Sequence, residues 1–201
     1  MINARLRQGW DRLMRPVGAG LARMRLSPDV VTVFGVALQV AVGVLILQGR
    51  LLVAGLVGIV AGFSDAFDGA LAKAQGRTSK WGAFFDSTTD RLSDALVLAP
   101  IAWLYGVDPD IADHHSELTA LLALVALVSS FLVSYTKARA ESLGFTCDVG
   151  IAERAERLII IIAALILDLV PLGVGLLAVL GTVTFVQRVV HVYLQGERRA
   201  P

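Results

Sequence analysis

The chain has 201 residues, of which 56% are hydrophobic and only 17% are charged. Soluble domains contain about 45–50% apolar and about 25% charged residues, so this composition, with its mean hydropathy of +0.70, predicts a membrane protein. The composition excludes a disordered chain, and a single cysteine, Cys147, excludes a disulfide scaffold. The formal net charge of +1 gives no indication of a nucleic-acid partner.

Residues 1–25 are predicted to form a basic amphipathic helix next to the membrane. Their arginines fill the faces left by an apolar stripe that recurs every three or four residues: Ile2, Leu6, Trp10, Leu13, Val17, Leu21 and Met24. A helix of this kind lies in the membrane interface, with its arginines near anionic headgroups. The alternative is a solvated helix that packs on its own domain.

Six apolar stretches follow, and a helix needs about 20 mostly apolar residues to cross the hydrocarbon core. The predicted spans are 30–48, 51–63 continued through Asp65 and Asp68, 95–106 extended backward through Asp86 and Asp90, 118–135, 158–167 ended by Pro171, and 172–193. The predicted fold is therefore an all-α integral membrane protein with six transmembrane helices after an interfacial amphipathic helix. Residues 26–195 would form the transmembrane domain, and residues 196–201 a cytoplasmic tail.

The basic residues predict the orientation of these spans. An even number of spans places both termini on one side, and every lysine and arginine except Arg50 then falls on that side. Because basic loops stay in the cytoplasm, this side is predicted to be cytoplasmic, in a multi-pass protein of the plasma membrane. The acidic segment 107–117 would lie outside.

Four aspartates sit at the cytoplasmic ends of two consecutive spans. Asp65 and Asp68 are three residues apart and share one helix face, and Asp86 and Asp90, four apart, share a face of the next helix. Four converging carboxylates repel one another unless cations neutralise them. Mg²⁺ prefers oxygen ligands, and two such ions can clamp an in-line displacement at phosphorus. The pattern predicts a site for two Mg²⁺ ions, with Mn²⁺ as the alternative.

These residues spell the signature D-x2-D-G-x2-A-R-x8-G-x3-D-x3-D. The segment from Asp65 to Asp90 has the same spacing throughout, including the small residues Gly69, Ala72 and Gly82, and departs only at Lys73, where the signature has arginine. The chain therefore resembles the CDP-alcohol phosphotransferase family. Lysine keeps the charge of arginine but loses its bidentate fork.

The resemblance implies a reaction and a set of roles. A CDP-linked lipid, CDP-diacylglycerol, would bind at the cytoplasmic membrane face, an acceptor hydroxyl would attack the β-phosphorus, and CMP would leave. Asp65, Asp68 and Asp86 would be metal ligands, and Asp90 would be both a ligand and the general base. The segment 26–32 resembles the nucleotide side of the family's site. The residues expected to bind the CDP-lipid are Pro28, Asp29, Thr32, Asp68, Gly69, Ala72, Lys73, Ser79 and Gly82.

Two further segments bear on the acceptor. Residues 134–141 (SYTKARAE) and 153–158 (ERAERL) resemble those of actinobacterial phosphatidylinositol-phosphate synthases and archaeal archaetidylinositol-phosphate synthases. The resemblance implies inositol 1-phosphate as the acceptor, its phosphate held by Lys137, Arg154 or Arg157, and Arg188. Local salt bridges to Glu153 and Glu156 are the alternative role for Arg154 and Arg157. Arg188 lies within a span, where it needs an anionic partner or a path to the interface.

Two other functions remain open from the sequence. Glycerol 3-phosphate also carries a phosphate, and a basic pocket alone does not separate it from inositol 1-phosphate. A small cation transporter would use the four aspartates as an ion path, although the sequence shows no repeat symmetry. The family resemblance also implies a homodimer.

Overall fold

The structure, a computed structural model, describes residues 27–76, 79–107, 116–151 and 153–199, together with Pro16 and Gly20. The predicted amphipathic helix 1–25 therefore lies outside the described residues, apart from those two. Within the helices, some side chains also lie outside the description: Pro28, Asp29, Asp65, Ala66, Asp68, Gly69, Lys73, Arg198 and Arg199. The described part is helical throughout, with α2 (Pro28–Leu47), α3 (Leu51–Ala74), α4 (Lys80–Val107), α5 (Ser116–Ser142), α6 (Arg154–Ile166) and α7 (Val170–Arg199).

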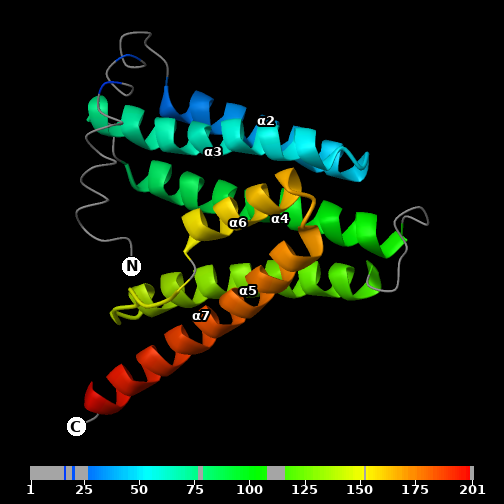
Figure 1. The fold of residues 1–201 in the computed structure, drawn as a ribbon. Coiled ribbons are helices and arrows are strands. Elements are labelled where there is room, and N and C mark those ends of the chain that lie inside the picture. Colours follow the sequence, from blue (N-terminus) through cyan, green and yellow to red (C-terminus); the bar gives the residue numbers. More distant parts are fainter. Residues whose placement is uncertain are drawn as a thin grey trace.

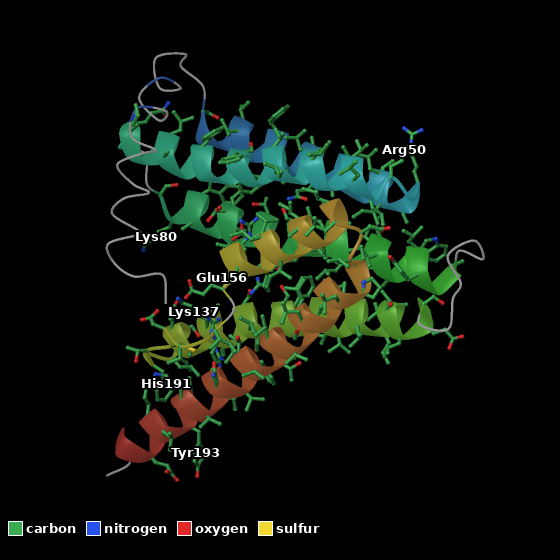
Figure 2. The ribbon with its side chains drawn as sticks, in the orientation of Figure 1. Arg50, Lys80, Lys137, Glu156, His191 and Tyr193 are labelled. Atoms are coloured by element: carbon green, nitrogen blue, oxygen red, sulfur yellow. The ribbon has the colours of Figure 1, made fainter. Side chains whose placement is uncertain are left out.

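The helices run alternately up and down, so their ends gather in two groups (Figure 1). One group consists of the first residues of α2, α4 and α6 and the last residues of α3, α5 and α7; we call it the basic end. Lys80 and Lys137 lie at this end, whereas Arg50 lies at the opposite one (Figure 2). The charge asymmetry predicted from the sequence thus corresponds to two ends of one bundle.

A helix lies at each of the six predicted spans, but the helices differ in length and hydropathy. Three are long and apolar enough to cross a membrane among the described residues, over Val30–Leu47, Ser116–Ser142 and Val170–Glu197. These three indicate a membrane protein. The apolar part of α3, Leu51–Ser64, is shorter, and α6 has only 13 residues. α7 also continues to Arg199, into the segment expected to be a tail.

The core lies where all six of these helices face one another, with Ala54 as the contribution of α3. Its largest fully buried residues include Ile46, Ile101, Leu104 and Leu165, and small residues such as Ala123 let the helices approach closely. Large apolar side chains on the outer faces remain exposed, among them Trp103 and Leu172. Exposed apolar side chains suit a bundle whose outer faces contact lipid, because such side chains then need no burial in protein.

α2 and α4 cross unusually closely because of one proline and one glycine. Pro100 lies inside α4 and has no N–H, so it cannot donate to the carbonyl of Leu96. That carbonyl oxygen faces Gly43 of α2, where an added Cβ would lie only 2.6 Å from it. Glycine is therefore required at position 43 for this crossing.

The boundary between α6 and α7 differs from the prediction. α6 ends in a Schellman turn, in which Leu169 N–H donates to the Ala164 carbonyl at 2.8 Å and Asp168 adopts a left-handed φ of 55°. Pro171 does not end the helix; it is the second residue of α7. Proline is accepted in a first helical turn because the N–H groups there have no intrahelical partner.

Candidate active site

The signature begins where α3 meets the start of α2. Ser64 Oγ, directly before Asp65, donates to the Val31 carbonyl of α2 at 3.2 Å. This contact places the α3 part of the signature beside Thr32, which is buried, and thus beside the segment 28–32 predicted to face the nucleotide. Ala72 is half-buried further along α3.

The second half of the signature begins with the cap of α4. Ser79 precedes the helix, and its hydroxyl oxygen accepts a hydrogen bond from Gly82 N–H at 2.9 Å. A Cβ on Gly82 would lie 3.3 Å from that oxygen, so glycine keeps the cap unstrained. Ser79 and Gly82, two of the residues predicted to bind CDP-lipid, therefore also fix where α4 starts, six residues before Asp86.

Asp86 and Asp90 lie on the first turns of α4, at the basic end, and Asp86 is exposed while Asp90 is half-buried. The side chains of Asp65, Asp68, Gly69 and Lys73, and of Pro28 and Asp29, lie outside the described residues. Among the described side chains, no group of three or more metal-binding residues is found. The carboxylate donors of Asp86 and Asp90 nevertheless suit hard divalent cations such as Mg²⁺ or Mn²⁺, and Asp90 lines a polar cavity.

A cavity of about 470 Å³ brings the predicted acceptor residues together with Asp90. It opens between α4, α5, α6 and α7, and its lining includes Asp90 and all four predicted acceptor residues, Lys137, Arg154, Arg157 and Arg188. Asp94, Glu141 and Glu153 also line it. Residues from distant parts of the sequence thus form one charged chamber, with the expected general base on the wall that α4 supplies.

Two ion pairs join α4 to α6 across this cavity. Arg154 Nη2 lies 3.1 Å from Asp90 Oδ1, and one turn deeper Arg157 Nη2 lies 3.1 Å from Asp94 Oδ2. The spacing of four on α4 and three on α6 sets the two pairs one above the other. The arginines thus contact aspartates of another helix, in addition to any local role.

Arg188 is the most buried of the four basic residues, with 4% of its surface exposed. Its Nε donates to the Val149 carbonyl at 2.9 Å and its Nη1 to the Val133 carbonyl at 2.6 Å. It forms no ion pair with a carboxylate in the described part of the chain. A buried guanidinium without a counter-ion is costly, and an anion in the cavity that it lines would lower that cost.

The segment 145–151 holds these basic residues in place against α7. Gln195 of α7 binds Thr146 through three hydrogen bonds of 2.7–3.1 Å, and Ile151 N–H donates to Thr184 Oγ1 at 3.3 Å. Asp148 of the same segment lies 3.1 Å from Lys137 Nζ. The segment therefore positions Lys137 and Arg188 together, which no local sequence pattern indicated.

Cys147 lies in this segment with no exposed surface. Burial raises the pKa of its thiol, against the lowering effect of Arg188 and Lys137. The thiol is thus kept neutral, and it packs as a small apolar group.

Comparison with known proteins places this site in a family. Residues 25–191 match the profile of the CDP-alcohol phosphatidyltransferases. The chain belongs to this family. An archaetidylinositol phosphate synthase of Pyrococcus horikoshii is 40% identical over 174 residues, which cover 86% of this chain and 87% of that protein. A phosphatidylinositol phosphate synthase of Streptomyces avermitilis is 37% identical over 207 residues, with 96% and 82% covered.

Solved structures of the family show the same fold. The crystal structure of Mycobacterium tuberculosis phosphatidylinositol phosphate synthase with CDP-DAG bound has a TM-score of 0.81, 34% identity and coverage of 90% of this chain and 94% of that one. The same enzyme with manganese and citrate also has a TM-score of 0.81 and 34% identity, with 90% and 88% covered. Because the chain belongs to a family of enzymes, the alternative of a cation transporter is rejected.

Proposed function

We propose that the chain transfers the phosphatidyl group of CDP-diacylglycerol to inositol 1-phosphate, forming phosphatidylinositol phosphate and releasing CMP. The observation that carries this proposal is the single cavity that joins Asp90 to Lys137, Arg154, Arg157 and Arg188. A carboxylate and a basic lining in one chamber suit a phosphorylated alcohol, because the carboxylate can accept its proton while the arginines hold its phosphate.

The chemistry is a displacement at the β-phosphorus of the donor. The acceptor hydroxyl oxygen forms a new bond to that phosphorus, the bond from phosphorus to the bridging diphosphate oxygen breaks, and CMP keeps the electron pair. Asp90 accepts the hydroxyl proton. Two divalent cations on Asp65, Asp68, Asp86 and Asp90, when bound, neutralise the diphosphate. Thr32, Ala72, Ser79 and Gly82, with Pro28, Asp29, Gly69 and Lys73, hold the nucleotide side.

Inositol 1-phosphate is favoured as acceptor by the basic lining and by the relatives. Arg188 brings a buried positive charge without a carboxylate partner among the described residues, and Lys137 stands on the facing helix. The relatives from Pyrococcus and Streptomyces are named for archaetidylinositol phosphate and phosphatidylinositol phosphate synthesis. Arg188 and Lys137 would bind the acceptor phosphate from opposite sides.

CMP release by the purified protein tests the proposal. CDP-diacylglycerol and Mg²⁺ would be supplied with inositol 1-phosphate, glycerol 3-phosphate or free inositol in parallel reactions. We expect release with inositol 1-phosphate alone. Release only with glycerol 3-phosphate would keep the aspartate chemistry and replace the acceptor, and release with none of the three would contradict the proposal.

The same proposal includes the setting of the enzyme. All six helices would cross the plasma membrane, with the helix 1–25 in the interface, residues 26–195 as the catalytic domain and the basic end in the cytoplasm. The basic residues gathered at that end support this orientation. The enzyme would act as a homodimer, which cross-linking in the native membrane would test.

A further inference from the structure

The floor of the acceptor cavity is an ion pair that the signature does not contain. Asp94, Arg154 and Arg157 line both the open cavity and a small internal void beside it, and the Arg157–Asp94 pair lies at the boundary between the two spaces. Arg157 is 8% exposed, and its Nη2 lies 3.1 Å from Asp94 Oδ2. Because its guanidinium also lines the open cavity, it can contact an anion that binds there.

Asp94 is itself held by a third helix. Ser130 of α5, which is fully buried, donates its hydroxyl proton to the same Oδ2 that binds Arg157. One carboxylate oxygen thus joins α4, α5 and α6 at a single point. A carboxylate bonded from two sides has little freedom to rotate, so the guanidinium that it binds is also fixed in direction.

A buried amide, that of Gln39, also lines the void next to the Arg157–Asp94 pair. Gln39 of α2 is 1% exposed, and its side-chain amide has no hydrogen-bond partner in the described part of the chain. It faces the internal void together with Asp94 and Arg157, and this void of about 20 Å³ has room for one water molecule. The region under the cavity is therefore built for polar contacts, although Leu98, Ile161 and Leu177 surround it.

We infer that Asp94 is a positioning residue, which with Ser130 aims Arg157 at the phosphate of the acceptor. This inference rests on the proposed function, since it concerns the same cavity. Asp94 does not touch the reacting atoms; it acts only through Arg157. Asp90 and Arg154, one turn nearer the cavity mouth, then belong to the transfer step, while Asp94 and Arg157 determine how tightly the acceptor binds.

Steady-state kinetics of Asp94→Asn test the inference. The amide keeps the size of the side chain but loses the charge, and we expect the KM for inositol 1-phosphate to rise about tenfold or more, because a charge-assisted hydrogen bond to Arg157 is lost. The kcat and the KM for CDP-diacylglycerol should change less than about twofold. Ser130→Ala should raise the acceptor KM in the same direction but less. Asp168→Asn makes the same chemical change in the exposed turn after α6, and should leave all constants unchanged.

A double-mutant cycle separates positioning from a general structural role. If Asp94 acts through Arg157, Asp94→Asn should add nothing to the acceptor KM of Arg157→Ala. Additive increases, or equal losses in kcat and in both KM values, would overturn the inference. Binding of inorganic phosphate to the purified variants provides a readout without turnover, and it should weaken in Asp94→Asn by the same factor as the KM rises.

The two proposals fail in different ways. If the wild-type protein uses glycerol 3-phosphate instead, the acceptor of the proposed function is wrong, but the cycle can be run with that acceptor. If the wild type uses inositol 1-phosphate and Asp94→Asn keeps its KM and its affinity for phosphate, the positioning role is wrong and the proposed function stands.

Discussion

Arg188 shows how a single side chain can be held by backbone and still serve a ligand. Its guanidinium donates hydrogen bonds to two carbonyls, on α5 and on the segment before α6, so its direction is fixed while its charge stays available to the cavity. From its place within a predicted span, this arginine was expected to have either an anionic partner or a path to the interface. The described part of the chain provides carbonyl oxygens instead, which stabilise the guanidinium without neutralising it.

For Arg188→Ala we expect the acceptor KM to rise by about tenfold or more, with a much smaller change in the KM for the CDP-lipid, because a charge-assisted contact to phosphate is lost. Initial rates at varied acceptor and varied donor would measure this. Arg188→Lys is the matched variant, since it keeps the charge without the planar fork, and its KM should lie between those of the wild type and the alanine variant. Equal changes in both KM values would mean that Arg188 has a structural role only.

Asp86→Asn should lower turnover by at least about a hundredfold, since an amide is a far weaker ligand for a divalent cation than a carboxylate. The loss should be accompanied by weaker Mn²⁺ binding, measured by calorimetry on the purified protein. Asp68→Asn should behave in the same way. Metal-dependent activity near that of the wild type in either variant would contradict the two-metal site.

The residues of the signature could be predicted from the sequence because their spacing is local and regular. The acceptor residues could be named from segments similar to known enzymes, and the cavity joins all four of them with Asp90. Asp94 lies four residues beyond Asp90 and outside the signature, and its partners Arg157 and Ser130 are 63 and 36 residues away. Contacts at such distances depend on how whole helices pack, which a single sequence does not reveal.

At the scale of the helices, glycines determine how closely neighbours approach. A Cβ added to Gly173 of α7 would lie 2.4 Å from the Cβ of Ala164 of α6, which cannot rotate away. Gly175, two residues further along α7, would meet only a Leu122 methyl group at 3.7 Å, an ordinary contact. The two glycines thus differ in function although they are neighbours in the sequence.

Gly173→Ala should therefore destabilise the protein by about 1–3 kcal/mol, because α6 and α7 would be forced apart. Gly175→Ala should leave stability unchanged or raise it by up to about 1 kcal/mol, since alanine favours the helix. Thermal unfolding of both variants in the same detergent measures the difference. A Gly173→Ala variant as stable as Gly175→Ala would show that α6 and α7 are not packed as described.

The helices themselves were predictable from hydropathy, but their ends were not. Apolar runs located all six, and the extensions of α3 and α4 through their aspartates were predicted from the length that a membrane span needs. The turn after α6 was misplaced because proline usually breaks a helix, and Pro171 was predicted to end one. In the structure it lies in the first turn of α7, where proline is accepted. The close crossing of α2 and α4 at Pro100 could not be predicted either, because it also depends on Gly43, a residue of another helix.

For the whole molecule, the two ends of the bundle carry different charge. Single cysteines introduced at Arg50 and at Lys80, in a Cys147→Ala background, would report which side each end occupies. We expect a membrane-impermeant maleimide to label Arg50→Cys in intact cells and Lys80→Cys only after permeabilisation, because basic ends face the cytoplasm. Labelling of both in intact cells would contradict the orientation.

The total number of charges and their order along the chain were sufficient to predict this asymmetry. They could not predict that the segment 145–151 folds back on α7, because its hydrogen bonds to Gln195 and Thr184 come from residues with no distinctive pattern. The charge asymmetry thus follows from the order of the charged residues, whereas the shape of the cavity follows from particular contacts.

The short α6 has a consequence for the lipid around the enzyme. Its 13 residues extend about 20 Å from the basic end, whereas the hydrocarbon layer is about 30 Å thick. Leu167 and Leu169 of the turn that follows, and Leu172 in the first turn of α7, are exposed by 64%, 46% and 69%. If α6 crosses the membrane as proposed, this turn would meet acyl chains before it reached the far surface, and the bilayer would have to thin over it to keep Asp168 hydrated. Short-chain lipids would relieve that mismatch, and under the proposed function a lipid-synthesising enzyme would thereby respond to the thickness of its own membrane.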